Sequence, residues 1–264
     1  NFSLIHDDVI DGDAERRHKP SVWSLFGVGR AIIVGDALVA LAQQVVLDPS
    51  GTMGCAIDPE VITSELDGVR TARRIADATA AMIAGQALDM AFEEKAHVSL
   101  EQCLAMEAGK TGALLGCAAS IGAAYVGAPE ETLDALHSFG VELGLAFQAV
   151  DDLLGIWGDP ETTGKPTFSD LRQHKKSLPI SAALDSDARG VDELAELLRR
   201  IDLDDADFAR AAGLVESCGG REVATNIATS RLTAALGSLD RIDLLGGPAA
   251  ELAELANFVV ERQF

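Results

Sequence analysis

Apolar residues recur at three- and four-residue intervals along most of the chain, and strand-like alternation of apolar and polar residues is rare. This spacing is typical of amphipathic helices. The chain is also rich in Ala, Leu, Glu and Arg, which favour helices. We therefore expect an all-α protein. The predicted helices cover residues 2–15, 29–47, 59–94 (one helix or two), 100–108, 113–126, 128–157, 180–200, 206–218, 221–239 and 248–263.

Short polar segments separate these helices. RRHKPSV turns the chain after the first helix, and LDPSGTMG forms a loop after the second. Ser99 with Gln102 predicts a capping box. GKTG, residues 109–112, interrupts the pattern, and residues 158–179 form the longest predicted polar loop. Because the chain has no repeat of fixed period and no clear interdomain linker, we expect one domain.

The charge of the chain argues against a nucleic-acid partner. It has 42 Asp and Glu residues against 21 Lys and Arg residues, a net charge of −21. Such an excess of acid repels the phosphate backbone of DNA or RNA.

The cysteines and the apolar runs indicate a cytoplasmic protein. The four cysteines have neither a CxxC pair nor the spacing of zinc ligands, so buried thiols in a reducing compartment are expected. The longest apolar run, residues 112–128, is rich in Gly, Ala and Ser and is shorter than the ~20 residues of a membrane span. It predicts a core helix that neighbouring helices approach closely. We find no integral membrane segment and no secretory signal. The chain starts without Met and already in apolar register, so we expect that upstream sequence is missing.

The segment LIHDDVID, residues 4–11, carries an unusual group of carboxylates. On a helix, Asp7 and Asp11 lie on one face with Asp8 beside them. Like charges at this spacing repel each other. Flanking apolar residues also keep them from being fully solvated, so a positive species is expected between them. Oxygen-only ligands suit Mg²⁺, which completes its shell with water and phosphate oxygens. The motif predicts a metal-bridged diphosphate.

A second aspartate pair stands in FQAVDDLLGIWGD, residues 147–159. One acidic motif in an acidic protein is most often a solvated surface. Asp151 and Asp152, however, lie within a mainly apolar helix, where two charges are costly without a function. Two such helices facing each other could hold metal ions across a cavity.

Basic residues gather at the breaks between helices, although they are few. A polyanionic substrate would need such contacts in a protein whose overall field repels it. Arg offers bidentate phosphate recognition and Lys a point charge. The candidates are Arg16, Arg17, Lys110, Lys165, Lys175 and Lys176.

Taken in order, LIHDDVID with the following RR and Pro, GQALDM, GKTGAL, FQAVDD and GKPTFSDLRQHKKSLP closely resemble the all-trans isoprenyl diphosphate synthases. The resemblance covers essentially the whole chain, and the combination is specific. It implies a single all-α domain over residues 1–264 that lacks its N-terminal helices. The family fold is an antiparallel helical bundle around a deep central cavity, the type I isoprenoid synthase fold, usually in a homodimer.

The resemblance also implies roles for individual residues. Asp7, Asp8 and Asp11 match the first aspartate-rich motif, and Asp151 and Asp152 match the second; both hold Mg²⁺. Arg16, Lys110 and Lys165 match residues that contact the allylic diphosphate, and Arg17 matches one for isopentenyl diphosphate. Thr111 and Gln148 match polar groups at the reaction centre, Lys175 matches a loop lysine, and Gln86 with Asp89 matches a helical element near the second metal cluster. The expected catalytic residues are Asp7, Asp8, Asp11, Lys110, Asp151 and Lys165.

The implied reaction is Mg²⁺-dependent condensation of isopentenyl diphosphate with an allylic diphosphate. The metal and the basic residues stabilise the departing diphosphate, and an apolar cavity keeps water from the carbocation. Phe2 and Ser3 lie one helical turn before the first aspartates. By family analogy a bulky residue there limits growth, so a product of fifteen or twenty carbons is expected.

The chain departs from the family at two points. The second motif has Gly155 in place of its third aspartate, and Asp159, four residues later, is a candidate for partial compensation. The upstream Gly-Gly-Lys and Arg elements that help to bind isopentenyl diphosphate are absent. Two alternatives therefore stay open. One is a class I terpene cyclase of the same fold, although two aspartate pairs and few aromatic residues favour the synthase. The other is a non-catalytic regulatory subunit of a prenyl synthase.

Overall fold

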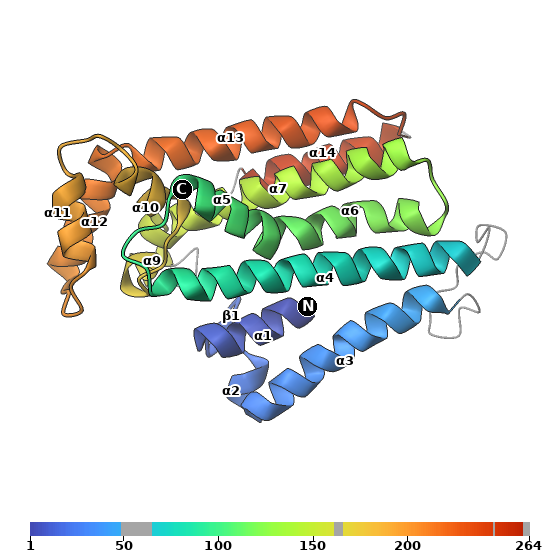
Figure 1. Ribbon diagram of the computed structural model, residues 1–264, viewed down its shortest axis with the longest axis horizontal. Helices are drawn as coiled ribbons and strands as arrows, with labels where there is room; N and C mark the ends of the chain where they lie inside the picture. The colour runs from blue at the N-terminus through green and yellow to red at the C-terminus, as the bar shows by residue number, and fades with distance from the viewer. Residues whose placement is uncertain (49–64, 161–165, 245, 261–264) are drawn as a thin grey trace. The chain divides into compact units, whose positions relative to one another are not determined.

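The computed structural model describes residues 1–48, 65–160, 166–244 and 246–260, which are almost entirely helical (Figure 1). The expected all-α class is confirmed. Within these ranges the strands are β1 (Glu15–Arg16) and β2 (Lys19–Pro20), a small antiparallel pair that the sequence pattern did not predict. Cys55, Lys165 and the first part of the predicted helix 59–94 lie outside the described residues.

The described residues form two compact units. The first comprises Asn1–Ile75 with Ala124–Gly127, and the second comprises Ala76–Ala123 with Ala128–Phe264. The boundary passes through α4 (Glu65–Glu93). The expectation of a single domain stays a prediction.

In the first unit, α1 (Phe2–Asp11) packs against α3 (Val28–Leu47), with α2 (Val22–Phe26) between them in the chain. A glycine permits this contact, because a Cβ at Gly35 would collide with the imidazole of His6. The Nε2 atom of His6 lies 3.1 Å from the carbonyl oxygen of Ile32. α1 is shorter than the predicted helix 2–15, since Gly12 adopts a left-handed conformation with φ of 70° and ends it.

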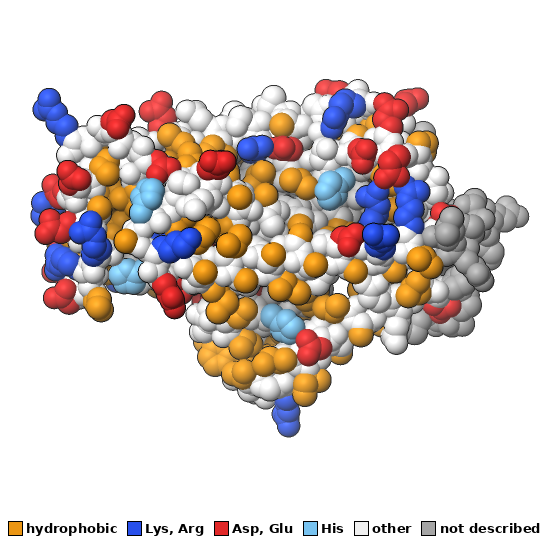
Figure 2. Space-filling view, in the orientation of Figure 1, with side chains coloured by type: hydrophobic (Ala, Val, Ile, Leu, Met, Phe, Trp, Pro, Cys, Tyr) orange, Lys and Arg blue, Asp and Glu red, His pale blue; other side chains and the backbone are white. Residues whose placement is uncertain are grey.

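Much of the apolar surface of α3 is exposed. Figure 2 shows hydrophobic side chains gathered over α2 and the beginning of α3, including Leu25, Phe26, Val28, Ile32 and Ile33. By length and composition α3 could cross a membrane, and it is the one described helix of which this is true. This is weak evidence, because helices of soluble proteins meet the same two criteria.

In the second unit, α7 (Glu130–Trp157) runs beside α13 (Gly220–Leu239), and α14 (Gly246–Val260) packs against both (Figure 1). The longest stretch of buried side chains lies on α7, which contributes to all three hydrophobic clusters of this unit. α7 is therefore the helix around which the second unit is built.

The predicted break at GKTG is wrong. Residues Ala108–Gly112 form a π-helical turn, η1, that joins α5 (Leu100–Glu107) to α6 (Ala113–Tyr125). Single π-helical turns of this kind occur frequently at functional sites. The capping box of Ser99 and Gln102 is confirmed. The expected close helix approach is also present, because a Cβ at Gly140 of α7 would collide with the backbone at Leu115 of α6.

The predicted boundaries fail most in the region after α7. The polar loop 158–179 contains a short helix, α9 (Ser169–Arg172). The predicted helix 180–200 is two helices, α10 (Leu178–Leu184) and α11 (Val191–Leu198), because the polar segment between them breaks the pattern. α12 (Asp205–Ser217) follows close to its predicted bounds.

Candidate active site

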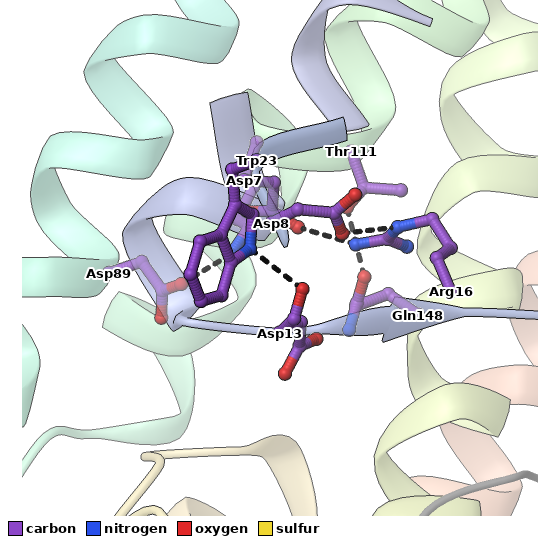
Figure 3. Close-up of polar contacts among 9 residues, drawn as sticks. Asp7, Asp8, Asp13, Arg16, Trp23, Asp89, Thr111 and Gln148 are labelled. Atoms are coloured by element: carbon purple, nitrogen blue, oxygen red, sulfur yellow. Dashed lines mark hydrogen bonds and ion pairs between the residues drawn. The ribbon is translucent and has the colours of Figure 1, made fainter. Parts of the chain in front are cut away.

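The first acidic motif is paired with an arginine inside the first unit. Arg16 Nε donates to Asp8 Oδ1 at 2.6 Å, and its Nη2 lies 3.5 Å from Asp7 Oδ2 (Figure 3). The side chain of Asp8 is 6% exposed, whereas those of Asp7 and Arg16 are 22% and 32% exposed. Because a guanidinium has five N–H donors, this pairing leaves Arg16 further donors for an anion.

A tight hairpin brings Arg16 back to α1. β1 pairs with β2 through a two-residue turn at Arg17 and His18, which have φ values of 53° and 59°. Positive φ at both positions is typical of a type I′ turn. Trp23 Nε1 donates to the carbonyl oxygen of Asp13 at 2.8 Å and holds the chain that leads into the hairpin. Arg16 thereby turns to the aspartates, and Arg17 is exposed at the tip.

In the second unit, close backbone contact between α4 and η1 positions Lys110. A Cβ at Gly85 would collide with the backbone nitrogen of Lys110, so only glycine allows this approach. Asp89 lies one helical turn beyond Gly85, and Lys110 Nζ donates to its Oδ2 at 2.5 Å. The π-helical turn thus places the predicted lysine beside the Gln86–Asp89 segment.

A chain of hydrogen bonds links three of the predicted residues. Thr111 Oγ1 donates to Gln148 Oε1 at 2.9 Å (Figure 3), and Gln148 Nε2 donates to Asp152 Oδ1 at 2.8 Å. The backbone N–H of Leu178 donates to Asp152 Oδ2 at 2.7 Å. Both oxygens of Asp152 therefore accept hydrogen bonds inside the protein, and its carboxylate ties the start of α10 to α7.

Asp152 is buried beside a second acid, Glu107. Burial raises the pKa of Asp152 to about 6, and burial followed by the charge of Asp152 raises the pKa of Glu107 well above its usual value. Cys103 Sγ lies 3.5 Å from Glu107 Oε1, and burial likewise raises the pKa of this thiol. The raised pKa values favour the protonated form, because two buried negative charges side by side are costly.

A pocket that is open to solvent lies within the second unit. Acidic and basic side chains meet there with a few others, and burial lowers the pKa of Lys176. The exposed Asp151 lies on this wall, but Asp159 is not part of it. The residues that line it are Asp89, Met106, Glu107, Lys110, Gln148, Asp151, Asp152, Asp170, Lys175, Lys176 and Ser177.

The donors on this wall suit a hard cation. They include carboxylate oxygens, which Mg²⁺ prefers, and two buried oxygens, Glu107 Oε2 and Ser177 Oγ, that have no hydrogen-bond partner within the described ranges. In the part of the chain that the structure describes, no group of three or more acidic, His or Cys side chains could hold a metal alone. Mg²⁺ sites commonly use one or two carboxylates and complete the shell with water and substrate phosphates, so the residues fit that ion.

Comparison with known proteins identifies the family. The model of the family described as Polyprenyl synthetase matches residues 1–215. The chain belongs to this family. The expectation of a trans-prenyltransferase of the isoprenyl diphosphate synthase type is thereby confirmed.

The most similar proteins compared include two enzymes of Mycobacterium tuberculosis. The chain is 43% identical to a (2E,6E)-farnesyl diphosphate synthase, covering 100% of this chain and 70% of the relative. It is 42% identical to a geranylgeranyl diphosphate synthase, covering 100% and 71%. A solved polyprenyl synthetase of Streptomyces coelicolor matches with a TM-score of 0.85 and 46% identity, covering 98% of this chain and 75% of that one.

The sequence pointed to several of the residues that line the pocket but not to all of them. The predicted residues that line the pocket are Asp89, Lys110, Gln148, Asp151, Asp152, Lys175 and Lys176, and their roles stay predictions. Glu107 and Asp170 were not predicted. The available signals were an acid three residues before Lys110 and the SD pair that opens α9, but many exposed acids of this chain have similar neighbours. Whether the first motif faces this pocket stays a prediction.

Proposed function

We propose that this protein condenses isopentenyl diphosphate with an allylic diphosphate, in a Mg²⁺-dependent reaction, to a trans-prenyl diphosphate of fifteen or twenty carbons. One observation carries the proposal. The carboxylates of Asp151 and Asp170 share one pocket with the ammonium groups of Lys110, Lys175 and Lys176. Carboxylates can take a metal and lysines can take phosphate oxygens, so this wall suits a metal diphosphate.

The reaction begins at the allylic diphosphate. Its C1–O bond breaks, and the diphosphate leaves with the bonding electrons. The double bond of isopentenyl diphosphate then attacks the allylic cation and forms the new carbon–carbon bond. A proton leaves the adjacent carbon to the released diphosphate, which restores a double bond. The product is a longer allylic diphosphate.

The residues of the chain have three tasks in this scheme. Lys110, Lys175 and Arg16 stabilise negative charge that grows on the leaving group. Lys165 and Arg17 are expected to contact the two diphosphates. Thr111 and Gln148, fixed by their mutual hydrogen bond, line the reaction centre. Bound Mg²⁺ would supply Lewis-acid stabilisation of the diphosphate, held by Asp7, Asp8, Asp11 and Asp151.

We assign Asp152 a structural role. The family resemblance counts it among the metal carboxylates, and both of its oxygens accept internal hydrogen bonds. Its task in this proposal is to hold Gln148 and α10 in place. The neighbouring Asp151 is exposed and supplies the oxygen donors.

The first helix and the relatives support the proposed product length. Phe2 and Ser3 are half-buried on α1, one turn before Asp7. A bulky side chain there would limit the growing chain. The two mycobacterial relatives are named for a farnesyl and a geranylgeranyl product, which agrees with fifteen or twenty carbons.

The proposal includes a homodimer in the cytoplasm. The exposed apolar side chains of α2 and α3 would be covered by a second copy of the chain, since large exposed apolar patches commonly mark interfaces.

A single incubation tests the reaction. Purified protein, Mg²⁺, labelled isopentenyl diphosphate and a primer of five, ten or fifteen carbons are combined, and the dephosphorylated products are separated by chromatography. We expect a labelled fifteen- or twenty-carbon alcohol, and diphosphate release only when both substrates are present. A cyclic hydrocarbon formed without isopentenyl diphosphate would instead establish a terpene cyclase. No diphosphate release from any primer would favour the regulatory subunit.

A further inference from the structure

We propose that Asp170 supplies the third carboxylate of the second acidic motif, in the place that Gly155 leaves open. This inference rests on the proposed function. Gly155 then leaves room for the carboxylate of Asp170, and the missing third aspartate does not weaken the site.

Gly155 lies about one helical turn after Asp151. The two residues are four apart on α7, so a side chain at 155 would project from the same face as Asp151. An added Cβ at Gly155 would lie under 3.0 Å from the Cγ and both carboxylate oxygens of Asp170. The carboxylate of Asp170 therefore occupies the space that a side chain at 155 would need.

The structure holds Asp170 firmly at this place. Asp170 is 7% exposed, and the preceding Ser169 donates its Oγ hydrogen to the carbonyl oxygen of Gly155 at 3.1 Å. Phe168, which opens α9, adopts a left-handed conformation with φ of 63°. Such a conformation is costly for a residue other than glycine and persists only where surrounding contacts impose it. The contact between α7 and α9 is therefore built around the glycine.

The surroundings of Asp170 suit the binding of a polar ligand. Asp170 and Asp151 line the same pocket, together with Lys110, Lys175 and Lys176. Two further polar atoms of that pocket, Glu107 Oε2 and Ser177 Oγ, belong to residues that are 2% and 6% exposed and lack a hydrogen-bond partner among the described residues. Buried polar atoms without partners are rare in folded proteins, and a bound polar group would satisfy them.

If Asp170 fills this place, an aspartate restored at position 155 should weaken ligand binding and not strengthen it. Asp at 155 would collide with Asp170 and place two like charges together. Gly155→Asp should therefore weaken the site, and removing the side chain at 170 should compensate. Asp159 gives a matched control, because it is an exposed aspartate of the same segment that does not line the pocket.

The experiment measures binding of Mg²⁺ with inorganic diphosphate by isothermal titration calorimetry, and turnover in parallel. The proteins are the wild type, Asp170→Asn, Gly155→Asp, Asp159→Asn and the double variant Gly155→Asp/Asp170→Gly. We expect at least about tenfold weaker binding for the first two variants, as is typical when a metal site loses a supporting carboxylate. Asp159→Asn should bind as the wild type does, and the double variant should bind more tightly than Gly155→Asp.

Several outcomes would overturn the inference. They are unchanged binding in Asp170→Asn, tighter binding in Gly155→Asp, or a loss in Asp159→Asn equal to that in Asp170→Asn. Thermal unfolding followed by circular dichroism shows whether each variant folds. If Asp170→Asn does not fold, Gly155→Ala carries the test, because a single Cβ displaces Asp170 and should weaken binding. The calorimetric measurement of binding does not depend on product formation. Wild type that binds Mg²⁺ with diphosphate but makes no prenyl product would therefore refute the proposed function and leave the inference about Asp170 standing.

Discussion

The two acidic motifs share a sequence pattern but differ in how the protein neutralises them. In the first unit, Asp8 is paired with Arg16, whose side chain is 32% exposed. In the second unit, Asp152 is buried and accepts hydrogen bonds from an amide and a backbone N–H. A partly exposed guanidinium neutralises the first motif, whereas Asp152 of the second motif accepts hydrogen bonds from groups in the core. The second should therefore be the more rigid site and the more sensitive to mutation.

Within each aspartate pair, one carboxylate is more exposed to solvent than the other. Asp7 and Asp151 are the more exposed members, and Asp8 and Asp152 are buried. An exposed carboxylate can bind a ligand at little cost to the fold, but a buried one is needed by its internal partners. The more exposed member of each pair is therefore the one whose substitution should disturb the fold least.

The largest expected effect is on turnover. Asp7→Asn and Asp151→Asn should each lower kcat at least about 10²-fold, because in the proposed reaction each carboxylate holds the Mg²⁺ that stabilises the leaving diphosphate. The melting temperature should change little. Steady-state kinetics with the primers above measures kcat, and Asp134→Asn, at an exposed position of the same helix as Asp151, serves as the control. Wild-type kcat in either variant would remove that residue from the reaction.

The next effect is on stability. Asp152→Ala leaves the N–H of Leu178 and the amide of Gln148 without their acceptor, which should lower the free energy of unfolding by about 1–3 kcal/mol. Asp8→Ala should cost less than about 1 kcal/mol, because Arg16 is partly exposed and can be hydrated. Urea denaturation of both variants measures the difference. Equal losses would mean that the two motifs are supported in the same way.

The smallest effect, counted per pH unit, is on the pH dependence of stability. Burial raises the pKa of Asp152 to about 6 and that of Glu107 well above its usual value, so the folded pair keeps a proton that the unfolded chain releases near pH 4 to 4.5. The folded state then binds more protons, and stability should fall as pH rises above this range. Glu107→Gln removes one titrating group and should flatten this slope by at most about 1.4 kcal/mol per pH unit.

Urea denaturation between pH 5 and 8 measures that slope for wild type and Glu107→Gln. Glu101→Gln, at an exposed position of the same helix, is the control and should leave the slope unchanged. A Glu107→Gln slope identical to that of wild type would show that Glu107 is ionised in the folded protein.

Local sequence signals predicted much of the fold. The bounds of α3, α5, α6, α12 and α13 follow the apolar spacing closely, because one helix face is decided by residues three and four apart. Prediction failed where packing replaced local preference. GKTG contains two glycines, yet it continues as a π-helical turn because α4 and α7 press against it on both sides.

The sequence by itself determined the class of fold, the two acidic motifs and most of the basic residues around the pocket. These follow from residue type and from spacing within a single helix. Only the tertiary structure decided that Asp152 turns inward, that Glu107 lies beside it and that Asp170 fills the space at Gly155. Each of these depends on side chains from helices far apart in the chain, and their contacts and desolvation exist only after the helices have packed.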